Sequence, residues 1–301
     1  MVLIIAIACS NSKSNKTIST SKEESEISSK LIVPINDDFK KYWYQGTAEI
    51  TSYSLEQARY GELRNGQAVL IFVTEDFLAK EQVKADYRNT DNIPILKLNS
   101  TKKFNTGIYP YSIMQSTFYP IHDNSHAIKV SSSMQEWCGH VYAQLNNREQ
   151  FEVLSHSYFQ GEADQEFLLP KAHLENEIWT KIRINPDKLP LGTIKMIPSF
   201  EYSRLKHKEM KAYTAEASLV KEGNIQTYTI NYPALKRTLK IDFTLKFPYE
   251  IEGWSETFTS GFGAGAKTLT TKATKLRRIK SAYWNKNSNK DEVLRDSLGL
   301  K

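Results

Sequence analysis

Apolar and polar residues alternate along most of the chain after residue 43, which is the pattern of half-buried β-strands. The alternation is clearest in Trp137–Gln160, where two such runs flank the loop that begins at Asn146. With Asn146 opposite Gln150, the odd-numbered residues form one apolar face, and His140 lies opposite His156 on the other. We expect this hairpin to be the centre around which the other strands assemble.

The same alternation predicts strands at residues 44–53, 60–72, 93–103, 108–120, 127–133, 213–220, 226–232, 239–247, 250–258 and 268–284. Asn65-Gly66 between apolar runs predicts a tight hairpin turn. Short helical turns are expected at residues 37–43 and 291–300. This pattern predicts a mainly β protein, built as an antiparallel curved sheet or a partly closed β-barrel.

Helical spacing over Pro170–Ile184 predicts the one principal α-helix, because Leu174, Ile178 and Ile182 share a face. Its acids, such as Glu175 and Glu177, are expected on the helix surface.

One β-rich domain is predicted over residues 31–301. Two β subdomains meeting near residues 169–197 are the alternative.

Residues 1–9 read MVLIIAIAC, an apolar run that resembles the signal segment of bacterial lipoproteins and ends at a cysteine, Cys9, which would carry acyl chains. No Lys or Arg precedes the run, so a truncation or a start codon placed too late is expected. The next 21 residues, 10–30, contain eight serines and predict a disordered tether. Such a tether would span roughly 25 Å. The alternative is a buried first strand of a cytosolic protein.

The net charge of +6 is unevenly distributed. Residues 267–290 hold eight Lys and Arg residues and no acid, which leaves 32 basic and 34 acidic residues elsewhere. A candidate patch for an anionic envelope component therefore comprises Lys275, Arg277, Arg278 and Lys280. The alternative is a solvated strand. A nucleic-acid partner is not expected for a protein of the envelope.

Three side chains of the hairpin, Cys138, His140 and His156, are candidate zinc ligands, because thiolate and imidazole both bind zinc. A partly exposed polar face is the alternative, and no other cofactor is indicated.

If Cys9 is lipidated, Cys138 has no partner for an internal disulfide. Gly261–Lys267 lacks the spacing of a phosphate-binding loop and is interpreted as a hairpin loop. No motif of nucleophilic catalysis occurs, which argues against an enzyme.

Several segments carry a family resemblance: YWYQG (42–46), LEQARYGE (55–62), FNTGIYPYS (104–112), QEWCGH (135–140), SHSYFQ (155–160) and RDSLGL (295–300). On these residues the chain resembles a family of uncharacterised lipoproteins of Bacteroidetes. Members sometimes carry the label "septum formation inhibitor Maf". The S-x-S-x-R-R motif of genuine Maf pyrophosphatases is absent from residues 10–16, so the residues do not support that label.

The resulting hypothesis is a lipid-anchored protein of the outer membrane, facing the periplasm or the surface, that binds a partner or ligand without catalysis. One alternative is a metal-assisted hydrolase at Cys138, His140 and His156. Another is a carrier of an apolar molecule in a half-barrel, for which a large apolar cavity would be the diagnostic feature. Neither the ligand nor the oligomeric state follows from the sequence.

Overall fold

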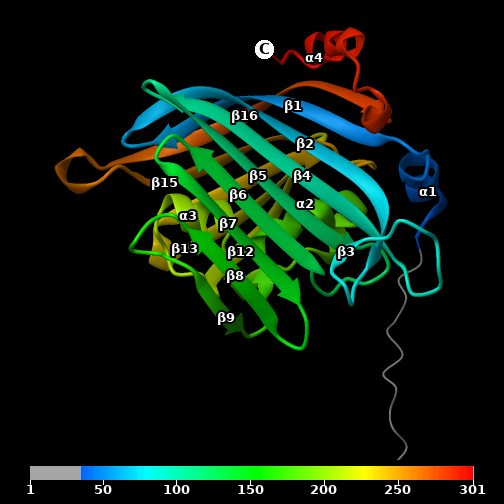
Figure 1. Cartoon of the computed structure of the whole chain (residues 1–301), viewed down its shortest axis with the longest axis horizontal. Helices are drawn as coiled ribbons and strands as arrows, with labels where there is room; N and C mark the ends of the chain where they lie inside the picture. Colours follow the sequence, from blue (N-terminus) through cyan, green and yellow to red (C-terminus); the bar gives the residue numbers. More distant parts are fainter. Residues whose placement is uncertain (1–34, 301) are drawn as a thin grey trace, which may run out of the picture. The chain divides into compact units, whose positions relative to one another are not determined.

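One large sheet of 16 strands organises residues 35–300, the part of the chain that the computed structural model describes (Figure 1). The strands are β1 (Ala48–Arg59), β2 (Glu62–Leu78), β3 (Val83–Lys84), β4 (Ile93–Thr106), β5 (Tyr109–Pro120), β6 (Lys129–Glu136), β7 (Gly139–Asn147), β8 (Phe151–Ser157), β9 (Gln165–Leu169), β10 (His173–Leu174), β11 (Gly192–Ile197), β12 (Tyr213–Glu222), β13 (Ile225–Tyr232), β14 (Arg237–Thr244), β15 (Ile251–Ser260) and β16 (Lys267–Ser281). The α-helices are α1 (Asp37–Trp43), α2 (Glu175–Ile184), α3 (Phe200–Leu205) and α4 (Val293–Ser297).

The strand order is β10-β11-β12-β13-β14-β15-β16-β1-β2-β4-β5-β6-β7-β8-β9, with β3 paired to β2. All neighbours are antiparallel except the short pair β10–β11. The sheet is therefore open, and its two edges are β9 and β10, which only residues 170–172 separate along the chain. The prediction of a mainly β, antiparallel curved sheet is confirmed.

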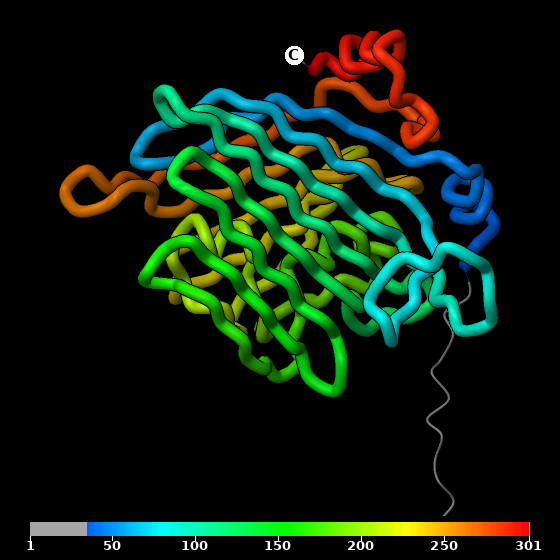
Figure 2. Tube along the Cα trace, in the orientation of Figure 1, coloured from blue at the N-terminus to red at the C-terminus, as the bar shows by residue number. Residues whose placement is uncertain are grey.

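The sheet folds back on itself, so that β12 and β13 lie behind β7 and β8 with helical segments between them (Figures 1 and 2). The main core joins inward-facing side chains of both halves, such as Leu98 and Ile241, to the apolar stripe of α2. Ile178 and Ile182 of that stripe are fully buried. The alternating residues of each strand thus place one face around the helix and the other toward solvent.

The hairpin β7–β8 lies near one edge of the sheet, so its predicted central place was wrong. Its predicted pairing was also wrong, because Asn146 pairs with Glu152 and His156 lies opposite Tyr142. The observed register differs from the predicted one by two residues. A shift of two keeps the same side chains on each face, so alternation alone cannot distinguish the two registers.

Asn65-Gly66 does not form the predicted turn but lies inside β2. The hairpin turns instead at Tyr60-Gly61, where both residues have positive φ (55° and 78°), as a type I′ turn requires. Gly66 has a packing role, because a Cβ atom there would lie 2.3 Å from the carbonyl oxygen of Lys103 on β4. The close approach of β4 explains why glycine stands at this position.

Helix α2 ends at Ile184 as predicted but begins at Glu175, five residues later than Pro170. The preceding residues instead pair with β11 through β10. The expectation of surface acids was wrong, since Glu175 and Glu177 are buried. The sheet surrounds this helix, so its polar side chains find their partners inside the protein.

Candidate functional site

A cavity of about 770 Å³ lies on the inner face of β6–β9, beside α3; we call it the groove. Its lining comprises Ser132, Met134, Val141, Ala143, Ser155, Phe159, Gly161, Glu162, Gln165, Phe167, Leu168, Leu169, Phe200, Ser203, Arg204, His207, Lys208, Glu209, Met210 and Lys211. Apolar side chains dominate the part lined by the strands. Charged side chains gather in the segments just before β9 and just after α3.

The groove is hollow because three small side chains lie side by side across neighbouring strands. Ser132 of β6 pairs with Ala143 of β7, and Ala143 pairs with Ser155 of β8. In the next inward-facing row, Leu145 and Val153 are large and fully buried. A row of small residues beside a row of large ones leaves space above the sheet, as β-barrels that hold a ligand also do.

The rim of the groove carries ion pairs. Arg204 donates from Nη1 to Oε1 of Glu162 over 3.1 Å, and its guanidinium lies over the ring of Phe159. His207 Nδ1 lies 2.9 Å from the same carboxylate oxygen. Lys208, by contrast, has no acidic partner within residues 35–300. The rim thus offers an unpaired ammonium group at the border of an apolar cavity.

A second, smaller cavity of about 50 Å³ lies between α2, α3 and both halves of the sheet, and several ionisable side chains line it. Lys102 donates to Glu201 over 2.7 Å, and Arg237 donates from Nε to Glu256 over 2.6 Å. Its volume holds a few water molecules rather than a metabolite. Because the carboxylates already have cationic partners, we interpret this cavity as part of the interior.

Two buried carboxyl groups beside this small cavity have pKa values shifted in opposite directions. Burial raises the pKa of Glu201, and the attraction of Lys102 does not compensate. At Glu175 burial also opposes ionisation, but the guanidinium of Arg237, together with hydrogen bonds from Tyr232 and Ser199, outweighs it and lowers the pKa. The two pKa shifts differ in direction because the cationic partners differ: Lys102 donates from one nitrogen atom to Glu201, whereas Arg237 donates from two nitrogen atoms to Glu175.

The predicted zinc ligands lie on the opposite face from the groove. His140 and His156 alternate with the inward-facing residues of β7 and β8 and are exposed, and His156 Nδ1 lies 3.2 Å from Oδ1 of Asp164. Cys138 is exposed in the turn between β6 and β7. A hydrogen bond with Glu136, above all, raises the pKa of its thiol. A thiol in that state is a poor source of the thiolate that binds zinc.

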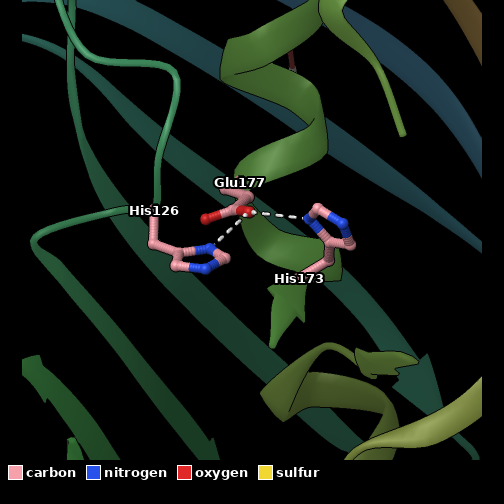
Figure 3. A group of neighbouring side chains, drawn as sticks. All are labelled: His126, His173 and Glu177. Carbon is pink, nitrogen blue, oxygen red and sulfur yellow. Dashed lines mark hydrogen bonds and ion pairs between the residues drawn. The ribbon is translucent and has the colours of Figure 1, made fainter. Parts of the chain in front are cut away.

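Among the described residues, one group has the spacing of metal ligands, and it is not the predicted one: His126, His173 and Glu177 (Figure 3). Their donor atoms all lie within 4.8 Å of one another. Sequence reasoning missed this group because His126 is 51 residues from Glu177 along the chain. The only local signal was the i, i+4 spacing of His173 and Glu177.

The predicted basic patch is largely neutralised within the protein. Lys275 pairs with Glu252, and Arg278 pairs with Glu250. Lys280 donates to the carbonyl oxygen of Tyr42 and lies over its ring. Arg277 alone of the four has neither an acidic nor an aromatic partner in the described part of the chain. The predicted lipid-attachment residue, Cys9, and the tether lie outside the described residues.

Across residues 35–300, no helix is long and apolar enough to cross a bilayer. No protein family and no curated protein matches the sequence. Among solved structures, the chain is similar to a β-barrel-like protein of the domain of unknown function DUF1849 from Brucella abortus. The two share 7% sequence identity with a TM-score of 0.45, over 78% of this chain and 98% of the other.

Proposed function

We propose that the folded domain is a non-catalytic carrier that binds an amphipathic molecule with a long apolar chain. The observation that carries this proposal is the groove, whose volume of about 770 Å³ lies within the usual range of small-molecule sites. The strand residues that line the groove are mainly apolar, whereas the second cavity, of about 50 Å³, has no room for such a ligand. Among the alternatives drawn from the sequence, a large cavity with an apolar strand face favours the carrier.

The apolar chain of the ligand packs against Met134, Val141 and Phe167, and its head group lies at the charged rim. Ten buried methylene groups would contribute about 8 kcal/mol. That contribution corresponds to a dissociation constant of about 1 μM at best, before the entropic cost of binding. Micromolar binding of a single-chain lipid is therefore the scale to test.

A fluorescent fatty acid, dansylaminoundecanoic acid, tests the groove directly. Ser155→Trp places an indole in the row of small side chains and should weaken binding at least tenfold. His156→Trp is the matched control, because the next residue of the same strand points to the opposite face. No saturable binding by the wild type, or equal binding by Ser155→Trp, would overturn the proposal.

We infer further that acyl chains on Cys9 anchor the protein in the outer membrane. The support is the apolar segment that ends at Cys9 and the serine-rich stretch that follows it. Stable attachment takes more than one acyl chain. Labelling with a radioactive fatty acid should mark the wild type and leave Cys9→Ala unlabelled, and equal labelling of both would refute the anchor.

A further inference from the structure

His126, His173 and Glu177 belong to three elements, two of which follow each other directly in the chain, and they meet beside the edge strand β10. His126 lies in the loop between β5 and β6, His173 in the edge strand β10, and Glu177 in the first turn of α2. Oε1 of Glu177 lies 3.2 Å from Nδ1 of His126 and 4.0 Å from Nδ1 of His173 (Figure 3). Tetrahedral zinc ligands, at bond lengths near 2.1 Å, are about 3.4 Å apart. Small side-chain rotations therefore suffice to bring all three atoms onto one ion.

The ring nitrogen of His173 supplies an independent observation. Its Nδ1 atom is buried and makes no hydrogen bond. It faces the Glu177 carboxylate at a distance too long for one. Imidazole nitrogens beside a carboxylate oxygen form a donor set that zinc takes up.

The remaining contacts hold Glu177 in position and leave one side open. Its Oε2 accepts a hydrogen bond from the backbone N–H of Ala127 over 2.9 Å. The side chain of Glu177 is 0% exposed, whereas those of His126 and His173 are 19% and 35% exposed. An ion can therefore approach from the histidine side, where a water molecule would complete the coordination.

One charge opposes a cation at this place. The ammonium of Lys181 lies 3.8 Å from Oε1 of Glu177 and donates to the carbonyl oxygens of Asn124 and Ser125. Its repulsion weakens binding of a divalent ion. Removing this charge should therefore tighten metal binding.

We propose that His126, His173 and Glu177 form a binding site for a divalent transition-metal ion, with zinc as the best fit to two imidazoles and one carboxylate. A bound ion ties the loop before β6 to β10 and to the start of α2. The site thus connects the two halves of the sheet near its open edges. This site is separate from the groove and does not depend on the carrier function.

The test is a calorimetric titration of the chelator-treated full chain with zinc chloride, with bound zinc counted after gel filtration. The wild type should bind one zinc per chain at this site. His126→Gln/His173→Gln should lose at least tenfold in affinity. The control His140→Gln/His156→Gln, on the outer face, should bind as the wild type does. Lys181→Met should bind zinc more tightly, and a gain in affinity cannot arise from misfolding.

Urea unfolding of the metal-free variants shows whether they fold. If the double variant is unfolded, His173→Gln alone replaces it, because Nδ1 of His173 makes no hydrogen bond that the change could break. Absence of stoichiometric zinc in the wild type would overturn the proposal. The proposal would also be overturned if the folded His126 and His173 variants bound zinc as tightly as the wild type does. Loss of zinc binding in the His140 and His156 control would overturn it as well.

Discussion

Arg183 of α2 donates two hydrogen bonds to Glu49 of β1, from Nη1 to Oε1 over 2.5 Å and from Nη2 to Oε2 over 2.7 Å. Both side chains are 1% exposed. The guanidinium also lies over the rings of Trp43 and Phe72. This pair connects the buried helix to a central strand, although 134 residues separate the two partners in the chain.

Breaking this pair should be costly. Glu49→Ala leaves the Arg183 guanidinium buried without its counter-ion, and we expect a loss of about 3–5 kcal/mol in the free energy of unfolding. Glu49→Leu/Arg183→Met removes both charges and should cost less than the single change. Urea unfolding measures both variants. A single variant as stable as the double variant would contradict the predicted role of the pair.

The pH dependence of stability should follow from the same pair. Burial opposes ionisation of Glu49, but Arg183, together with the Tyr42 hydroxyl and Arg278, outweighs it and lowers the pKa of the carboxyl group. A depressed folded-state pKa stabilises the protein above the unfolded value of about 4.3. This contribution is lost as the pH falls through the folded-state pKa. Between pH 5 and pH 2, Glu49→Leu/Arg183→Met should therefore lose less stability than the wild type. Parallel pH profiles would argue against this linkage.

Lys208, the unpaired cation at the rim of the groove, should make the proposed carrier bind a carboxylic acid more tightly than the corresponding ester. Lys208→Glu should weaken binding of dansylaminoundecanoic acid about three- to tenfold and leave binding of its methyl ester unchanged. Lys240→Glu makes the same change of charge on β14, outside the groove, and is the control. Equal effects of Lys208→Glu on acid and ester would show that the residue does not contact the head group.

The close approach of β4 to Gly66 predicts a packing defect. Gly66→Ala places a methyl group against the carbonyl oxygen of Lys103 and should cost about 1–3 kcal/mol. Gly265→Ala is the control, because no atom lies within 4 Å of the methyl group it adds. Thermal unfolding should show a lower midpoint for Gly66→Ala than for Gly265→Ala. The reverse order would contradict the predicted close contact.

Local patterns in the sequence were sufficient to predict most of the strands and helices. Alternation identified strands such as β7 and β15, and the helical turn at residues 37–43 coincides with α1. The glycine-rich segment after Ser260 is the predicted hairpin loop between β15 and β16. These features depend on neighbouring residues alone, and the sequence records them directly.

The candidate sites depended on contacts that are remote in sequence. The zinc ligands predicted from the β7–β8 hairpin assumed a register that the structure does not have. The cluster of His126, His173 and Glu177 exists only because the fold brings the loop between β5 and β6 to the stretch in which β10 leads into α2. The groove, likewise, needs Ser132, Ala143 and Ser155 to lie in register across three strands.

The sequence by itself therefore determined the β class, the two faces of the strands β7 and β8, and the end of α2. Only the tertiary structure decided the strand order, the registers and the surroundings of that helix. The physical reason is that a two-residue shift leaves the alternation of a strand unchanged. In the same way, a charged residue on a helix has the same local pattern whether it faces water or, like Arg183, a buried carboxylate.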